Sequence, residues 1–87
     1  MKIKDGFILR EVAGSFIVVA VGEAVKNFHG IINLNETGAF LWKILESGAS
    51  KEDLIKALLA EYDVDEKTAV SDVNGFIEKL QEAKLVL

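Results

Sequence analysis

The segment from Leu34 to Leu45 reads LNETGAFLWKIL, the pattern of a strand end that runs into a capped helix. Asn35 suits the N-cap position, and Glu36 follows in the first turn, where the helix dipole favours an acidic side chain. Behind this cap, apolar residues recur at helical spacing: Phe40, Leu41, Ile44 and Leu45. Trp42, the only tryptophan, shares this helix and is interpreted as a core residue rather than as a platform for a ligand.

The residues before this segment have the pattern of a small β-sheet. Residues 1–34 contain three segments rich in β-branched and aromatic residues, separated by short turn-like stretches: Phe7 to Val12, Ser15 to Val21 and Phe28 to Leu34. The first turn, Ala13-Gly14, is short enough to predict a hairpin. Three antiparallel strands are therefore expected.

The residues after it carry helix signals. Ser50 with Asp53 three positions later suits a capping box for a second helix, and Asp65 suits the cap of a third helix over about 66–83. We expect one α+β domain over residues 1–87, winged-helix-like. Its β-sheet part spans 1–34 and its three-helix part spans 35–87.

Composition excludes several classes of function. The 87 residues contain no cysteine, so disulfides, thiolate metal sites and cysteine nucleophiles are absent. A net charge of −4 argues against binding to nucleic acid or to an anionic membrane. The first long apolar run, Phe16 to Val21, is far too short to span a bilayer, and with no visible targeting segment the cytoplasm is the expected location.

The sequence offers no grouping of residues that would perform catalysis. His29 is the single histidine, and with no catalytic partner in sight it is interpreted as a surface or strand residue. Acidic pairs such as Glu61 with Asp65 alternate with lysines, as on a solvated helix face. We therefore expect no catalytic residues, no metal ligands and no cofactor, and the protein is not expected to be an enzyme.

The third predicted strand has the features of an exposed sheet edge. Phe28 to Leu34 reads FHGIINL and lacks Lys, Arg, Asp, Glu and Pro, whereas the first strand is bordered by charged residues that discourage pairing. In a simple meander the third strand is an edge, open to an incoming extended peptide. Gly30 lets another backbone approach closely. The alternative is that the domain itself, or a second copy of it, covers this edge.

The third helix has a broad apolar surface. Ala69, Val73, Phe76, Leu80 and Ala83 form one stripe, and Val70 and Ile77 lie together to one side of it. One interpretation is that Val70 and Ile77 are simply buried. The other is that they line a groove beside the third strand, so that a peptide would lie between strand and helix.

The LNETGA segment, following three strands and preceding two further helices, resembles the signature of the coenzyme PQQ synthesis protein D family. Members of that family, also called RiPP recognition elements, hold the leader of a ribosomally made precursor peptide for a modifying enzyme such as a radical SAM enzyme. The resemblance implies a non-catalytic peptide chaperone for PQQ, lasso or radical SAM-modified peptide biosynthesis. By position, it implies ten peptide-binding residues: Phe28, His29, Gly30, Ile31, Ile32, Asn33, Val70, Val73, Asn74 and Ile77.

Two other classes of function share this pattern. One is a structural winged-helix module that dimerises through its third strand, so both a monomer and a homodimer are compatible with the sequence. The other is a DNA-binding winged helix. Its recognition helix would need a basic face, but the polar positions of the third helix are mostly acidic, so no nucleic-acid partner is expected.

Overall fold

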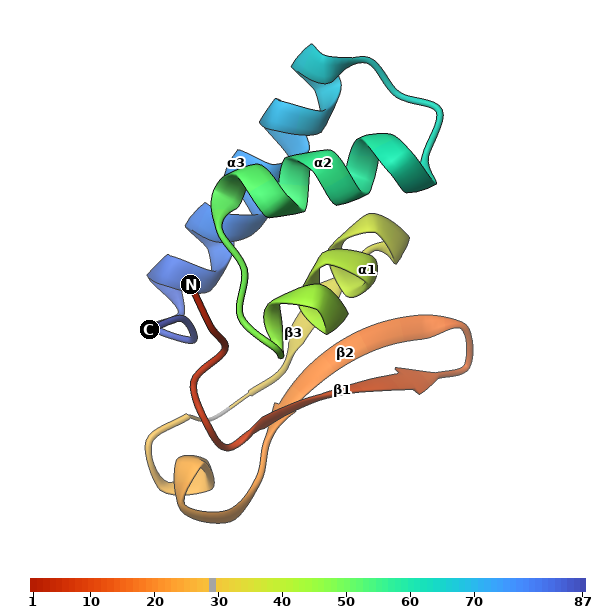
Figure 1. The fold of residues 1–87 in the computed structure, drawn as a ribbon. Helices are drawn as coiled ribbons and strands as arrows, with labels where there is room; N and C mark the ends of the chain where they lie inside the picture. Colours follow the sequence, from red (N-terminus) through yellow and green to blue (C-terminus); the bar gives the residue numbers. More distant parts are fainter. Residues whose placement is uncertain (29) are drawn as a thin grey trace.

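The computed structural model describes residues 1–28 and 30–87, and the predicted order of three antiparallel strands followed by three helices is confirmed (Figure 1). His29, one of the residues expected to bind peptide, lies outside the described residues. The elements are β1 (Phe7–Val12), β2 (Ser15–Ala20), a 3-10 helix η1 (Gly22–Lys26), β3 (Ile32–Leu34), α1 (Glu36–Leu45), α2 (Lys51–Glu61) and α3 (Glu66–Glu82).

The sheet is a meander in which β2 is central and β3 forms one edge. The β1–β2 hairpin closes at the pair Val12 and Ser15. Its two loop residues, Ala13 and Gly14, have φ of 50° and 81°, as the hairpin turn with two left-handed residues requires. Strand β3 pairs with β2 through three residues, with Ile17 opposite Asn33.

The third strand is shorter than the predicted Phe28 to Leu34, because regular pairing begins only at Ile32. Phe28 instead continues from η1: its N–H donates to the carbonyl of Ala24 at 3.1 Å, and its ring packs edge-on against Phe7. Gly30 has a φ of 135°, which is not a strand conformation and which side chains disfavour. The chain therefore turns before it enters the sheet.

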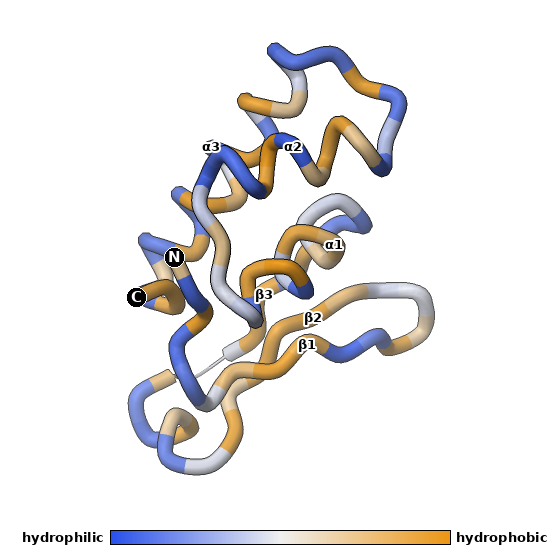
Figure 2. Tube along the Cα trace, in the orientation of Figure 1, coloured by the Kyte–Doolittle hydropathy of each residue, from blue (hydrophilic) through white to orange (hydrophobic). Residues whose placement is uncertain are grey.

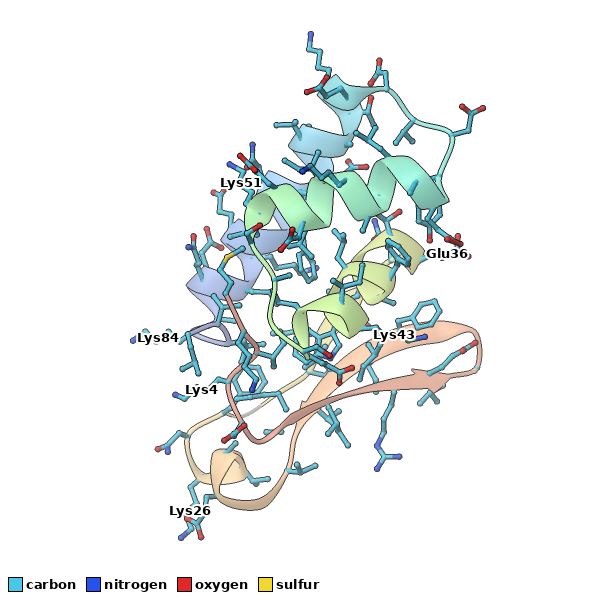
Figure 3. The ribbon with its side chains drawn as sticks, in the orientation of Figure 1. Lys4, Lys26, Glu36, Lys43, Lys51 and Lys84 are labelled. Carbon is cyan, nitrogen blue, oxygen red and sulfur yellow. The ribbon has the colours of Figure 1, made fainter. Side chains whose placement is uncertain are left out.

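The three helices lie on the same side of the sheet, with α1 directly over it and α2 stacked beyond α1, and the core lies between these layers (Figure 1). Trp42 is fully buried, as predicted, together with Val18 from the sheet and Leu80 from α3. The hydropathy colouring shows the hydrophobic positions of β1 and β2 running beneath α1 (Figure 2). Charged side chains lie at the periphery, as the labelled Lys26 and Lys84 illustrate (Figure 3). Among the described residues, no helix is both long and apolar enough to cross a membrane.

All three predicted helix caps are present. The Asn35 side chain accepts a hydrogen bond from the Gly38 N–H at 2.7 Å. Ser50 and Asp53 form a reciprocal capping box, with both hydrogen bonds at 3.0 Å. Asp65 accepts from the Thr68 N–H at 2.8 Å. These local bonds satisfy donors that a helix start leaves unpaired, so they fix where each helix begins.

The C-terminal segment pairs with the N-terminal segment. Ile3 and Val86 form an isolated antiparallel bridge. The Lys4 N–H donates to the Leu85 carbonyl at 2.7 Å, and the Leu87 N–H donates to the Lys2 carbonyl at 2.9 Å. Because the C-terminal residues pair here, they do not occupy the edge of the sheet at β3.

Candidate functional site

The hydrogen-bonding direction of β3 follows from the pairing at the opposite end of the sheet. The Val21 N–H donates to the Gly6 carbonyl at 2.8 Å. The backbone N–H and carbonyl groups of every second residue before Val21 in β2 therefore also point toward β1. The backbone N–H and carbonyl groups of the residues between them, Phe16 and Val18, point toward β3. There they pair with Leu34 and Ile32. Asn33, between these two, directs its N–H and carbonyl away from the sheet. It is the residue of β3 that a further strand would pair with.

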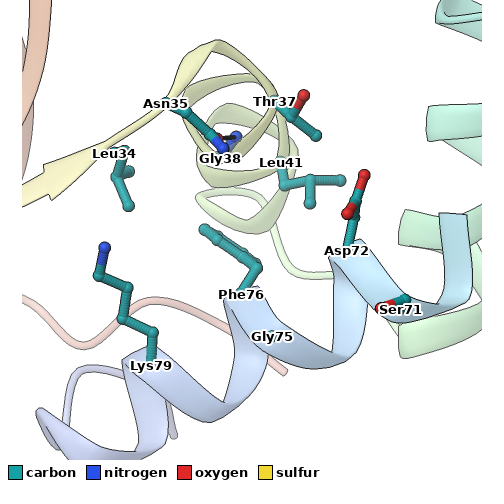
Figure 4. A pocket seen from close by; sticks show the side chains of 10 residues that line it. All are labelled: Leu34, Asn35, Thr37, Gly38, Leu41, Ser71, Asp72, Gly75, Phe76 and Lys79. Atoms are coloured by element: carbon teal, nitrogen blue, oxygen red, sulfur yellow. Dashed lines mark hydrogen bonds between the residues drawn. The ribbon is translucent and has the colours of Figure 1, made fainter. Parts of the chain in front are cut away.

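A groove with a volume of about 370 Å³ lies beside this edge, between the β3–α1 junction and α3 (Figure 4). The junction side and the helix side each contribute five residues. The lining residues are Leu34, Asn35, Thr37, Gly38 and Leu41 on one side, and Ser71, Asp72, Gly75, Phe76 and Lys79 on the other. Part of the LNETGA segment thus forms one wall of the groove.

Two glycines shape the groove in different ways. A Cβ on Gly75 would meet no heavy atom within 4 Å, so this position in α3 opens onto free space. A Cβ on Gly38 would lie 3.2 Å from Oδ1 of Asn35 and 3.4 Å from Cβ of Leu34. Gly38 therefore allows the first turn of α1 to pack closely against the end of β3.

The charged groups of the groove lie on α3. The Nζ of Lys79 donates a hydrogen bond to the carbonyl oxygen of Asn33 at 2.7 Å. Asp72 lies about 10 Å from Lys79 along the same helix, because the two residues are seven positions, or two turns, apart. Between them the wall is apolar, formed by Phe76. The groove thus combines an apolar centre with one cation and one anion.

The predicted strand residues lie at or near this site. Ile32 and Asn33 belong to β3, and Asn33 contacts Lys79 directly. Ile31 is 56% exposed although it is a large apolar residue. Gly30 is exposed next to it, whereas the half-buried Phe28 packs on Phe7. The structure therefore places the second half of the predicted segment at or near the site, whereas Phe28 packs away from it.

The predicted helix residues lie elsewhere. Val73 is fully buried, and Ile77 is a member of the hydrophobic core. Ile77 and the exposed Asn74 border a different depression, one shared with Met1 and Lys51. Val70 is half-buried and does not line the groove beside β3. The opposite flank of the α3 stripe faces β3, so the wall of this groove is formed by Asp72, Gly75, Phe76 and Lys79 instead.

The site has the character of a binding surface. Among the described residues, no cluster of potential metal ligands is found and no polar or charged residue is buried. The two acidic side chains with a lowered pKa, Asp53 and Asp65, owe it to their hydrogen bonds at helix caps. A sheet edge that no further strand pairs with, beside a groove with an apolar centre, suits an extended peptide that adds a strand.

Comparison with known proteins agrees with the interpretation of this site as a binding surface. The family model of coenzyme PQQ synthesis protein D (PqqD) matches residues 8–86. The chain therefore belongs to the coenzyme PQQ synthesis protein D family, as the LNETGA segment indicated. A search of curated proteins found no match.

Two solved structures share the fold. "TbiB1 in Complex with the TbiA(beta) Leader Peptide" superposes with a TM-score of 0.76 at 26% identity, covering 99% of this chain and 94% of that chain. "Lasso peptide synthetase B1 complexed with the leader peptide" has a TM-score of 0.75 at 21% identity, covering 99% and 95%. Both of these similar proteins were solved with a leader peptide bound.

Proposed function

We propose that this protein binds the leader of a ribosomally made precursor peptide and presents the rest of that precursor to a modifying enzyme, without chemistry of its own. The observation that carries the proposal is the outward-facing backbone N–H and carbonyl of Asn33, which pair with no strand of the sheet, beside the groove. Membership of the PqqD family and similarity to two proteins solved with leader peptides support it.

The leader would bind as an added strand. Its backbone pairs with the N–H and carbonyl of Asn33, and Gly30 and Ile31 are exposed, uncharged residues that precede it in the chain. Successive side chains of a strand point to opposite faces, so every second leader residue enters the groove toward Phe76. Of the residues predicted on α3, Val73 and Ile77 would act indirectly, by holding the helix against the core.

The proposed role also indicates the partner, the location and the oligomeric state of the protein. A leader held on β3 leaves the remainder of the precursor free, so the partner is an enzyme that modifies that remainder. We place the encounter in the cytoplasm, because that is where a ribosomal product is first available. A leader and a second copy of the protein would compete for the same edge. The protein with a leader bound therefore does not dimerise through β3.

The test uses fluorescein-labelled synthetic peptides that correspond to the leaders of precursors encoded beside this gene. We expect their fluorescence anisotropy to rise on binding to the wild-type protein. Asn33→Pro should lower the affinity at least tenfold, because it removes the outward N–H. The fold should survive this change, since that N–H makes no bond to β2. Asn33→Ala is the matched control, because it keeps the backbone groups and should bind normally.

Two results would contradict the proposal. One is a well-folded wild-type protein that binds none of these leaders. The other is an Asn33→Pro variant that binds them as tightly as the wild type. A dimer in sedimentation that Asn33→Pro dissociates would instead favour the structural module that pairs through β3.

A further inference from the structure

One hydrogen bond crosses the groove at the point where a peptide would pair. The Nζ of Lys79, on α3, donates to the carbonyl oxygen of Asn33, on β3, at 2.7 Å. Within the described part of the chain, it is the only side-chain hydrogen bond between residues far apart in sequence. It engages the outward carbonyl of β3 that an added strand would need.

Within residues 1–28 and 30–87, the Lys79 ammonium has no carboxylate partner. The single ion pair among the described residues joins Lys26 and Glu23 at 3.1 Å, on η1. Asp72, the acidic residue of the same groove, is two helical turns from Lys79. Lys79 is exposed and bonds only to a neutral carbonyl. A hydrogen bond between two charged groups is stronger than one to a neutral acceptor, so an incoming carboxylate would be a better partner.

We propose that Lys79 is a latch on the edge of the sheet that selects leaders carrying an acidic residue at one defined position. This inference rests on the proposed function, since it assumes that a leader pairs with β3. The amide N–H of the leader replaces the ammonium on the Asn33 carbonyl. The released ammonium then binds a carboxylate of the leader.

The geometry of strands sets the position of that acidic residue. Leu34 and Ile32 direct their side chains to the covered face of the sheet, so Asn33 directs its side chain to the other face. The leader residue opposite Asn33 shares the face of Asn33. Its two neighbours therefore point toward α3 and Lys79. The acidic residue should lie directly before or directly after the leader residue that pairs with Asn33.

The latch has opposite consequences for two kinds of leader. A leader with the acidic residue exchanges one hydrogen bond of Lys79 for a charge-assisted one. A leader with a neutral residue at that position must displace Lys79 from the Asn33 carbonyl but offers the ammonium no carboxylate to bind. Removing the ammonium should therefore weaken the first complex and strengthen the second, and a merely structural role for Lys79 would not produce this reversal of sign.

The first experiment is a selection from a random peptide library displayed on phage, carried out in parallel on three proteins. Peptides selected by the wild type should be enriched in Asp or Glu at one fixed position of the pairing segment. Lys79→Met keeps the apolar stem of the side chain and should abolish this enrichment. Lys79→Glu should replace it with Lys or Arg. Lys67→Met, an exposed change on α3 outside the groove, should select the same peptides as the wild type.

The second experiment measures one selected peptide against a version in which its glutamate is replaced by glutamine. By fluorescence anisotropy, Lys79→Met should bind the glutamate peptide about two- to fivefold more weakly than the wild type does. It should bind the glutamine peptide more tightly than the wild type does, also about two- to fivefold.

The outcomes separate this inference from the proposed function. Selected peptides that need the Asn33 backbone but show no acidic preference, or a preference that Lys79→Met leaves intact, would overturn the latch and leave strand addition in place. A selection that yields no peptide dependent on the Asn33 backbone would overturn both.

Discussion

Gly75 lies inside α3, where glycine destabilises a helix relative to alanine. No neighbour requires this glycine, because an added Cβ would contact nothing within 4 Å. Its position in the lining of the groove gives a different reason for its presence. Without a side chain at this point, a peptide can approach the helix closely.

This interpretation predicts opposite effects on stability and binding. Gly75→Ala should raise the free energy of unfolding by about 0.5–1 kcal/mol, measured by urea denaturation. Gly75→Phe should weaken leader binding at least tenfold in fluorescence anisotropy, because the ring would fill the groove. Asn74→Phe is the matched control on the neighbouring, exposed position that faces away from the groove. Normal binding by Gly75→Phe would show that the peptide does not lie there.

Ile77 tests which flank of α3 belongs to the core. It is only 8% exposed, so Ile77→Asp should place an unpaired charge in the interior and lower the free energy of unfolding by about 3 kcal/mol or more. Asn74→Asp, on the same flank but exposed, should change it by less than about 0.5 kcal/mol. Thermal melting followed by circular dichroism measures both. A native-like melting curve for Ile77→Asp would instead indicate that Ile77 lies at the surface, as a residue that lines a peptide-binding groove would.

At the scale of elements, the features set by neighbouring residues were predictable. The β1 range and the three helix caps follow from strand propensity, from a short turn and from side chains that bond three residues onward. The beginning of β3 was not predictable in this way. FHGIINL reads as a continuous strand, but Phe28 packs on Phe7 and only Ile32 to Leu34 pair with β2.

The wall of the groove was unpredictable for a related reason. Helical periodicity locates the stripe of α3 that faces the core, but the stripe has two flanks. Which flank faces β3 depends on how α3 packs across the molecule, and the sequence pattern contains no such information. Lys79 reads as one more surface lysine, and its contact with Asn33 spans 46 residues.

The cap of α3 makes stability depend on pH. Hydrogen bonding to the side chain and backbone N–H of Thr68 holds the pKa of Asp65 below its usual value. The ionised cap therefore stabilises the fold above the pKa of the unfolded chain. This contribution is lost as the pH falls through the lower pKa of the folded state.

Asp65→Asn should reduce the sensitivity to acid, because asparagine caps a helix but does not titrate in this range. The fall in melting temperature between pH 7 and pH 3 should be smaller for this variant than for the wild type. Asp63→Asn removes a carboxylate of the same charge without altering a cap, and it should keep the wild-type fall. An equal fall in Asp65→Asn would mean that the cap does not contribute to the acid response.

At the scale of the whole molecule, the three-stranded sheet found in the described residues has two edges, and they differ in how they are protected. The outer edge of β1 carries Arg10 and Glu11, charged residues that discourage strand pairing. The C-terminal residues pair with residues 2–4 rather than with β3. Among the described residues, the only side-chain hydrogen bond to the outward edge of β3 is the one that Lys79 donates to Asn33. This difference directs an incoming strand to one side of the molecule.

If the terminal pairing serves the fold and the groove serves binding, the two should be separable. Leu85 is fully buried and does not line the groove, so Leu85→Ala should lower the free energy of unfolding by about 2–4 kcal/mol. Leader affinity, measured by anisotropy at a temperature where the variant is folded, should stay within about twofold of the wild type, because additivity holds for distant sites. Leu87→Ala, at a side chain that is 76% exposed, should change neither quantity. A loss of affinity in folded Leu85→Ala would instead couple the terminal pairing to the groove, and β3 would then depend on the whole core for its peptide-binding conformation.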